Sequence, residues 1–504
     1  MTVNVRPSVY SSAETFPLVI PAGVTLARDA TCGSGTVAII RADGSTTSCP
    51  LQRAAGGTSS CAIAMSGAGS VLRDLAVKNT KGWAVAFGSG ADASTHLVSG
   101  VIGCEGAGCA ANGGADLAFV GSASPTIGPA DGASSTLTLA PAPNAVYVAD
   151  SAAPVIRNLQ NLVGFSADVL RVDDTASPTL RNLTLNWPSG SGAANAAFGV
   201  NITGSGGAVT MDHVWMSSCA LGGVRLSRGG AGVHTWNDLQ VVASAGNPNQ
   251  TRGFGLFLDA PSGTAHVALT GGVLRDNNGD GATIDNAVVS LQGTLISANG
   301  TYVGAGCHGG NGLTINAAAA KAALSTVTIT GSAGNDQGCT NGNGVRIVQG
   351  SATITSSIIA NNGFDGIRAE FNTTSADIST TVISGNGANG IDLEQTTVVR
   401  LGQCTSSCSG GANLFDCPVG SGGAGNARAN LCLYTPIPFM GVSQLAQNNQ
   451  WSNDPPTVAS QGASFTNGAC ATGTSADIVI VQPAFGLGSS SVQTSPEQTG
   501  LTCP

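Results

Sequence analysis

The sequence predicts an all-β solenoid, in which short parallel strands wind into stacked coils, and the main evidence is a repeated phrase. Between residues 279 and 393 it returns five times: an Asn or Asp, a Gly, then a three-residue strand with mostly aliphatic outer members. The glycines of successive copies lie 31, 32, 22 and 24 residues apart. No long stretch with a helical period separates the copies, which excludes a helical repeat. The copies are residues 280–284, 311–315, 343–347, 365–369 and 389–393.

A second phrase shows that the repetition begins earlier in the chain. Residues 153–159 read Ala-Pro-Val-Ile-Arg-Asn-Leu, and residues 177–183, which begin 24 residues later, read Ser-Pro-Thr-Leu-Arg-Asn-Leu. Strands of the same kind recur from residues 62–65 onward, although less regularly. We therefore predict one solenoid over residues 31–400, with about fourteen coils.

Each coil is predicted to contain a strand, a turn, a second strand, an Asn-Gly corner and a third strand. Asn and Gly suit these corners because both tolerate a positive φ. Equivalent side chains of successive coils stack about 4.8 Å apart, so aliphatic residues form inner ladders. One such ladder is expected to contain Ile284, Ile315, Ile347, Ala369 and Leu393.

Composition excludes several classes of function. The chain has 504 residues, 9% of them charged, a formal charge of −9 and no basic run, so nucleic acid is not an expected partner. No apolar stretch approaches the length of about 18 residues that a membrane-spanning helix needs. The hydrophobic content of 42% is enough to supply a core.

Residues 1–30 are predicted to start the solenoid and cover its open end, because an uncovered end is an unpaired sheet edge. Residues 14–26, which read Glu-Thr-Phe-Pro-Leu-Val-Ile-Pro-Ala-Gly-Val-Thr-Leu, resemble the opening of a bacterial family of unknown function found at the N-termini of surface and secreted proteins. The repeats to residue 400 resemble the right-handed parallel β-helix, or pectin-lyase-like, superfamily. This resemblance implies a right-handed coil, and a site on one long face if the protein is an enzyme.

The cysteines indicate an oxidising compartment. Six of the fourteen lie in residues 404–504, where strand phrases are few, so we expect residues 401–504 to form a Cys-rich cap or a small appended module. Cys219 has no near partner in the sequence. The N-terminus shows no signal peptide, and we interpret the chain as a mature extracellular or cell-surface segment with an added start Met. The alternative is a cytosolic protein with free thiols. The expected disulfides are Cys104–Cys109, Cys404–Cys408 and Cys307–Cys339, the last between successive coils.

Two columns of polar residues are predicted to point outward on adjacent coils. The middle residue of each strand phrase and the residue two positions later alternate away from the core. Near the end of the repeats these columns bring together Arg346, Arg368, Glu370, Asp392 and Glu394. Asp259 and Asp285 should also lie on adjacent coils.

These columns allow two interpretations. Glu370, Glu394 and Asp392 could supply general acid and base for cleavage of an acidic polysaccharide, with Arg346 and Arg368 binding its acidic groups and Asp259 and Asp285 as further ligand-binding residues. Alternatively, the columns form a solvated ladder of salt bridges, which would contribute little to stability.

No cofactor is predicted, and calcium is the one alternative. Residues 276–281 match the first half of a calcium loop, but Ala287 stands where a bidentate Glu is needed. The five histidines show no metal-ligand spacing. Asp173 and Asp174 resemble a hydrolase Asp pair and residues 307–309 a Gly-His-Gly element, but more than 130 residues separate them.

The sequence thus favours a secreted or cell-surface protein with a structural, adhesive or glycan-binding role. The alternative is a polysaccharide lyase or glycoside hydrolase that uses the face from Arg346 to Glu394. The expected partner is a polysaccharide or another cell-surface component. The assembly state is left open.

Overall fold

In a computed structural model the chain is divided into two units, residues 1–240 and 241–504, and each is a right-handed parallel β-helix. No described residue lies in a helix, so none of them belongs to a helix that would cross a membrane. The structure describes residues 1–6, 9–10, 16–29, 38–41, 48–51, 53–54, 59–103, 113–131, 136–139, 142–163, 167–186, 198–230, 232–244, 253–260, 265–300, 310–333, 341–370, 375–394, 398–404, 408–409, 411–415, 426–434, 443–447, 449–451, 456–462, 477–482 and 491–493.

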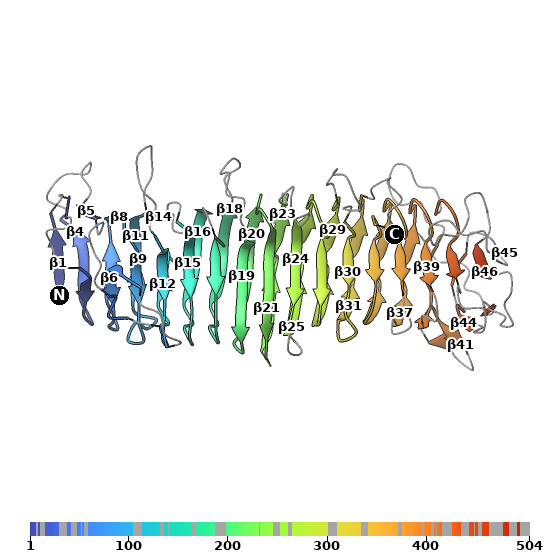
Figure 1. The fold of residues 1–504 in the computed structure, drawn as a ribbon, viewed down its shortest axis with the longest axis horizontal. Coiled ribbons are helices and arrows are strands. Elements are labelled where there is room, and N and C mark those ends of the chain that lie inside the picture. The colour runs from blue at the N-terminus through green and yellow to red at the C-terminus, as the bar shows by residue number, and fades with distance from the viewer. Residues whose placement is uncertain are drawn as a thin grey trace. The chain divides into compact units, whose positions relative to one another are not determined.

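Unit 1 contains three sheets of parallel strands, and successive coils contribute neighbouring strands to each sheet (Figure 1). The first sheet contains β1 (Thr2–Val5), β4 (Thr25–Arg28), β7 (Val71–Arg73), β10 (His96–Leu97), β13 (Thr126–Ile127), β16 (Val155–Val163), β18 (Thr179–Asn186), β20 (Thr210–Ser217) and β22 (Val233–Asn237). The second contains β2 (Val9–Tyr10), β5 (Ala38–Arg41), β8 (Leu75–Lys78), β11 (Ser99–Ile102) and β14 (Thr136–Leu139). The third contains β3 (Leu18–Ile20), β6 (Cys61–Met65), β9 (Trp83–Phe87), β12 (Ala115–Phe119), β15 (Asn144–Val148), β17 (Leu170–Val172), β19 (Phe198–Ser205) and β21 (Gly222–Gly229).

Unit 2 repeats the same plan with three columns of parallel strands. The first contains β25 (Ala265–Thr270), β28 (Ala287–Gln292), β31 (Lys321–Ser325), β34 (Ser351–Thr355), β37 (Ser375–Ser379) and β40 (Val398–Arg400). The second contains β26 (Val273–Arg275), β29 (Leu295–Ser297), β32 (Thr328–Thr330), β35 (Ile358–Ala360) and β38 (Val382–Ser384). The third contains β24 (Phe254–Asp259), β27 (Ala282–Asp285), β30 (Leu313–Ile315), β33 (Val345–Ile347), β36 (Ile367–Ala369) and β39 (Ile391–Glu394).

Parallel pairing continues beyond residue 400, where the sequence pattern showed few strands. In the third column β39 pairs with β43 (Leu431–Tyr434), which pairs with β46 (Ile478–Gln482), and β46 pairs with β45 (Val458–Gly462). Two short pairs are formed by β41 (Gln403–Cys404) with β42 (Cys408–Ser409), and by β44 (Ser443–Leu445) with β47 (Ser491–Gln493). The remaining described strand, β23 (Gln240–Val242), spans the boundary between the two units.

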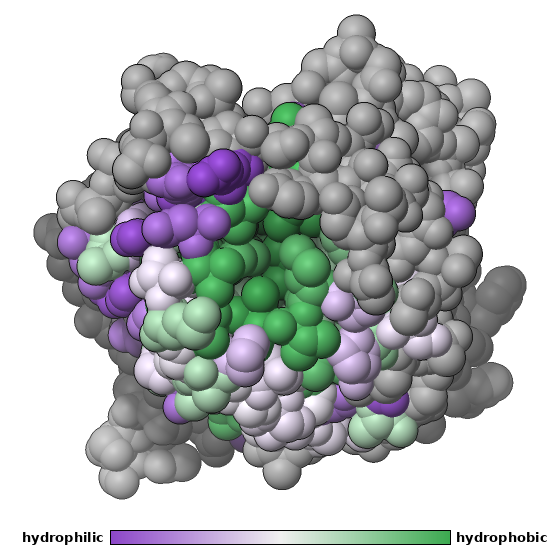
Figure 2. All heavy atoms as spheres, turned by 90° about the vertical axis from the view of Figure 1, so that its left-hand side faces the viewer, coloured by the Kyte–Doolittle hydropathy of each residue, from purple (hydrophilic) through white to green (hydrophobic). Residues whose placement is uncertain are grey.

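The core of each unit is the interior of its coil. At the end of unit 1 that carries β1, apolar residues occupy the centre and more polar residues lie around it (Figure 2). In unit 2 the predicted inner ladder is confirmed: each member pairs directly with the next, and all are fully buried. The ladder extends further, because Leu393 pairs with Leu433 and Leu433 with Ile480.

The repeated Asn-Gly phrase has a different basis from the one that the sequence suggested. None of Asn311, Asn343 and Asn389 has a positive φ, and neither do the glycines that follow them. Instead, each of the first four residues before the Gly accepts a hydrogen bond at Oδ1 from the backbone N–H of its counterpart on the next coil, at 2.7–3.2 Å, and Asn389 accepts one from Ala429 at 3.3 Å. This asparagine ladder contains Asp280, Asn311, Asn343, Asp365 and Asn389.

The Gly that follows each ladder residue is required by close packing. A Cβ on Gly312 would lie 2.3 Å from Cγ2 of Ile329 and 2.6 Å from the carbonyl oxygen of Gly344. Gly344 and Gly366 are equally confined by the next coil. The expectation of a positive φ fits other positions instead, such as Asn158 and Asn182, whose φ angles are 56° and 49°.

One disulfide is formed between two described cysteines, Cys49 and Cys61, a pair that sequence analysis did not propose. Cys432 is also disulfide-bonded. Cys219 is a buried free thiol, as its isolation in the sequence suggested, and burial raises its pKa to about 12. Cys219 is therefore a thiol rather than a reactive thiolate at neutral pH.

The backbone places Cys404 and Cys408, which the sequence predicted to form a disulfide, opposite each other. These residues are direct partners in the antiparallel pair β41–β42, at a spacing where a disulfide can form. The bond itself remains a prediction. The other predicted pairs fall outside the described residues: Cys104 with Cys109, and Cys307 with Cys339.

We predict that Ile347→Asp prevents unit 2 from folding. Ile347 is fully buried between Ile315 and Ala369, and a carboxylate there would have no partner. Ala323→Asp, on the exposed side of β31, should leave melting nearly unchanged. Circular dichroism melts of both variants measure this, and equal melting temperatures would contradict the register of the ladder.

Candidate functional site

The two outward columns of unit 2 are in the predicted register. Arg346 pairs with Arg368, and Arg368 pairs with Asp392, on β33, β36 and β39. Glu370 and Glu394 follow two positions after Arg368 and Asp392. The coil repeat therefore brings together the five residues that the sequence selected.

Arg368 is the centre of this group. Its Nε donates to Oε1 of Glu370 at 2.8 Å, and its Nη2 donates to Oε1 of Glu394. Nη1 lies 3.7 Å from a carboxylate oxygen of Asp365 and 3.7 Å from one of Asp392. One guanidinium thus faces four acidic side chains, and we call these residues with Arg346 the Arg368 cluster.

Arg346 supplies a second positive charge to the cluster. Its Nε and Nη2 donate to the two carboxylate oxygens of Glu370, both at 3.1 Å, which is a bidentate pair. An aromatic ring completes the surroundings, because the guanidinium carbons of Arg368 and Arg428 lie 5.9 and 5.7 Å from the centre of the Phe364 ring. Carboxylates and the face of an aromatic ring are both partners that attract a guanidinium cation.

The expectation that this face is exposed is wrong for most of the cluster. Arg368, Glu370 and Asp392 are only 4%, 5% and 0% exposed, so they do not form a solvated ladder. The side chains of Glu394 and Arg346 retain 15% and 27% exposure. Of the three carboxylates proposed as catalytic, Glu394 is therefore the one that a large substrate would reach most readily.

Burial raises the pKa of three carboxyl groups in the cluster. The pKa of Glu394 rises to about 7, mainly through burial, although the charge of Arg368 opposes the shift. The pKa of Asp365 is raised for the same reasons. The pKa of Asp392 is raised well above its usual value by burial and by the neighbouring charge of Asp365. Neither carboxyl oxygen of Asp392 accepts a hydrogen bond from a described residue, which fits a protonated side chain.

Asp259 and Asp285 are direct partners on β24 and β27, as predicted, and both are partly buried. In the calcium-like loop, Asp280 accepts hydrogen bonds from the backbone N–H of Asn311 and the hydroxyl of Thr283. Asp276 pairs with Arg275 at 3.1 Å. The described residues contain no group of three or more His, Cys, Asp or Glu side chains placed to hold a metal ion.

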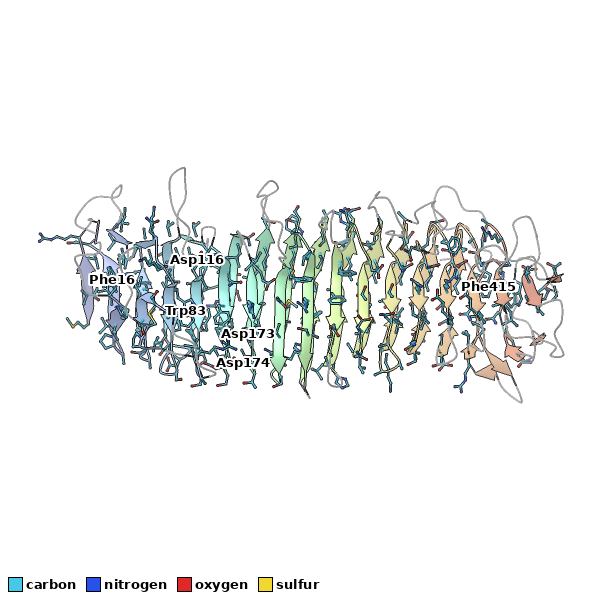
Figure 3. All side chains as sticks on the ribbon, in the orientation of Figure 1. Phe16, Trp83, Asp116, Asp173, Asp174 and Phe415 are labelled. Atoms are coloured by element: carbon cyan, nitrogen blue, oxygen red, sulfur yellow. A yellow bond between two sulfur atoms is a disulfide. The ribbon has the colours of Figure 1, made fainter. Side chains whose placement is uncertain are left out.

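Unit 1 holds a second charged group around Asp173 and Asp174, which Figure 3 shows close together on the ribbon. Arg53, 121 residues away, donates to both carboxylate oxygens of Asp174 at 2.8 Å. Asp173 accepts hydrogen bonds from Thr203 at 2.6 Å and Arg171 at 3.0 Å, and these hold its pKa below the usual value despite burial. Both Asp residues are thus occupied by internal partners.

Residues 48–51 and 53–54 lie on the outer side of the third sheet, and Arg53 reaches this group from there. The disulfide Cys49–Cys61 ties the segment to β6. Beneath it lie Ala64, Ala86 and Ala118, direct partners on β6, β9 and β12, all fully buried. The outer face of this part of unit 1 is therefore covered by its own chain.

Sequence analysis did not single out Trp215, which is 49% exposed on β20. Val214 and Met216 on either side of it are buried. Trp215 therefore takes an outward position in the alternation of buried and exposed residues along β20. A large aromatic residue at an outward position is the sequence signal that could have identified this surface. Thr184 of β18 is its direct partner.

Polar, uncharged side chains lie beside Trp215 on β18 and β20, while ion pairs of Asp212 with Arg181 and His213 lie earlier on the same strands. The Thr184 hydroxyl donates to Oε1 of Gln160 on β16 at 2.7 Å. Ser217 donates to Oδ1 of Asn186 at 2.5 Å, on the strands that carry Trp215 and Thr184. We call this surface the Trp215 strip, and its residues are Gln160, Thr184, Asn186, Trp215 and Ser217.

The sequence matches no family model and no curated protein. Among solved structures, the periplasmic alginate epimerase AlgG matches with a TM-score of 0.37 at 12% identity, over 68% of this chain and 77% of that chain. Tailspike protein 3 of bacteriophage CBA120 matches with a TM-score of 0.32 at 12% identity, over 88% of this chain and 58% of that chain. The PL6 family alginate lyase AlyGC matches with a TM-score of 0.25 at 10% identity, over 99% and 97%. Similarity at this level assigns no activity to the chain.

We predict that Arg368→Met destabilises unit 2 by about 3–5 kcal/mol, because it leaves the buried carboxyl groups without their central counter-charge. Arg400→Met is the matched control: the Arg400 side chain is 74% exposed and lies 3.7 Å from Asp377, so its loss should cost under about 1 kcal/mol. Urea unfolding of both variants measures the difference. Equal losses would show that the cluster contributes no more than a surface pair.

We also predict that Glu394 makes unit 2 less stable as pH rises. Its pKa is raised from 4.5 to about 7, so the folded state binds the proton more tightly than the unfolded state. Stability is then lost as pH rises through this range. Glu394→Gln removes the titrating group. The difference between the melting temperatures of the variant and of wild type should therefore grow in favour of the variant from about pH 5 to about pH 8. Parallel melting curves across that range would contradict the raised pKa.

Proposed function

We propose that this protein binds uncharged segments of extracellular glycans without cleaving them, and that the Trp215 strip is the binding surface. The exposure of Trp215 is the observation that carries this proposal. A large aromatic ring held outward on a sheet offers a flat apolar surface of the kind that the C–H face of a sugar ring packs against. The amides and hydroxyls beside it match the hydrogen-bonding groups of sugars.

Charge supports an uncharged ligand at this surface. The five residues of the strip carry no formal charge, so they offer no ion pair to an acidic sugar. The strip also lies on regular strands, which hold its side chains at fixed spacings and reduce the entropy lost on binding. Disulfide bonding at Cys49–Cys61 and at Cys432 supports an oxidising, extracellular location.

A glycan array probed with wild type, Trp215→Ala and Val233→Ala tests the proposal. Val233 is 52% exposed on the neighbouring strand β22 and serves as the control for loss of exposed apolar area. Trp215→Ala should lose at least about tenfold in affinity for the glycans that wild type binds, a change of about 1.4 kcal/mol. Val233→Ala should bind as wild type does. Unchanged binding by Trp215→Ala would exclude the strip.

The Arg368 cluster supports a second candidate function, cleavage of an acidic polysaccharide. The supporting observation is Glu394, which combines partial exposure with a pKa of about 7. Such a carboxyl group can exchange a proton with a substrate near neutral pH. In this mechanism Arg346, the most exposed member of the cluster, would bind an acidic group, while Arg368 would hold Glu394 in place.

Assays for new reducing ends and for unsaturated products on acidic polysaccharides separate the two functions. If the protein is an enzyme, Glu394→Gln should abolish product formation, while Asp377→Asn on the exposed side of β37 should not affect it. Absence of products with wild type would reject the enzymatic candidate and leave glycan binding.

A further inference from the structure

Arg228 is a buried cation in the interior of unit 1. It follows Val224 and Leu226 at the inward positions of β21 and is 1% exposed. Its Nε donates to the carbonyl oxygen of Thr203 at 2.9 Å, and Nη1 donates to that of Ala176 at 2.7 Å. Arginine is rarely buried to this extent without a carboxylate partner.

The charge of Arg228 persists at neutral pH. Burial lowers its pKa to about 10, while the charges of Asp173 and Asp174 act against the shift. No described carboxylate forms an ion pair with Arg228, and the two Asp residues are already engaged by Arg171 and Arg53. Its Nη2 is buried and has no hydrogen-bond partner among the described residues. A buried charge left in this condition is costly.

Two other side chains in the same region are also donors. The indole Nε1 of Trp236, which is fully buried on β22, has no partner among the described residues. The ring of His234 lies edge-on to the Trp236 ring, with 6.3 Å between centroids. Its Nδ1 accepts the backbone N–H of Val209 at 3.1 Å, so the hydrogen of the neutral ring is on Nε2.

Backbone contacts place His234 near Arg228. His234 accepts the N–H of Val209, and a Cβ on Gly207, two residues earlier, would lie 2.7 Å from the Ala176 carbonyl oxygen to which Arg228 donates. Burial and the charge of Arg228 lower the pKa of His234 to about 4, so its ring is neutral at physiological pH. The buried atoms of Arg228 and Trp236 that lack a partner among the described residues are therefore both donors, and one of them is cationic. A water molecule would bring two hydrogens of its own, whereas a small anion accepts from every side.

We propose that the interior of unit 1 binds a single halide ion, chloride under physiological conditions, at Nη2 of Arg228, and we expect Nε1 of Trp236 to be its second donor. The site is separate from the Trp215 strip and does not depend on glycan binding. Its consequence is that chloride stabilises unit 1 by specific binding to the folded state, rather than by general screening of surface charge.

Thermal unfolding of the whole chain in sodium chloride and in sodium gluconate, at equal ionic strength, tests the proposal. Chloride should raise the melting temperature of unit 1 by about 2–4 °C and approach saturation, as expected for one site. Arg228→Met should abolish the difference between the two salts. Arg181→Met, in which an arginine side chain that is 49% exposed on β18 is replaced, should retain it. Identical melting of wild type in both salts would overturn the proposal.

A second measurement covers the case in which Arg228→Met does not fold. Crystals of wild type grown in sodium bromide should show an anomalous peak within hydrogen-bonding distance of Arg228 Nη2. Trp236→Phe keeps the ring but removes the N–H, and should weaken the chloride dependence of melting without abolishing it. An ordered water and no bromide at this position would overturn the proposal.

Discussion

Backbone N–H groups at the corners of unit 2 find their acceptors on side chains of the adjacent coil, and this requirement fixes the register of the stack. Buried amides must be paired. The N–H of the Gly that follows each ladder residue donates to a backbone carbonyl of the next coil, whereas the N–H of the ladder residue itself needs a side-chain acceptor. The asparagine ladder supplies it at distances of 2.7–3.2 Å. A slip of one residue would remove these acceptors and turn the aliphatic ladder outward.

Stacking in register forces like residues together, with different effects inside and outside the coil. Inside, Ile284, Ile315 and Ile347 pack well because they are alike. Outside, Arg346 stacks on Arg368, which would be repulsive alone. The four carboxyl groups around Arg368 offset this repulsion. Burial, however, raises the pKa values of three of them, Glu394, Asp392 and Asp365. The first role of the cluster is thus to neutralise the two stacked arginines, and any chemistry at Glu394 is secondary to that role.

Unit 1 distributes its charged and apolar groups differently. Its outward alanines are covered by Cys49 and Leu51, and Asp173 and Asp174 are occupied by Arg171 and Arg53. Arg228 lies in the interior, where a solenoid normally places aliphatic residues. The exposed aromatic surface at Trp215 differs from these groups because no described residue covers it fully. The proposed glycan-binding surface therefore lies on the outer strands, and the proposed halide site lies in the interior.

The sequence alone determined the fold class, the inner ladder and the register of the outward columns, because strand alternation and coil length are local properties that repeat. It did not determine which outward residues are exposed. Arg368 and Asp392 have the outward parity that the sequence predicted, yet the tertiary structure buries them. Arg53 reaches Asp174 across 121 residues, and no local pattern records such a contact. The sequence also did not show why Asn and Gly recur in the repeated phrase. Hydrogen bonds and close contacts between coils require them there, and a positive φ does not.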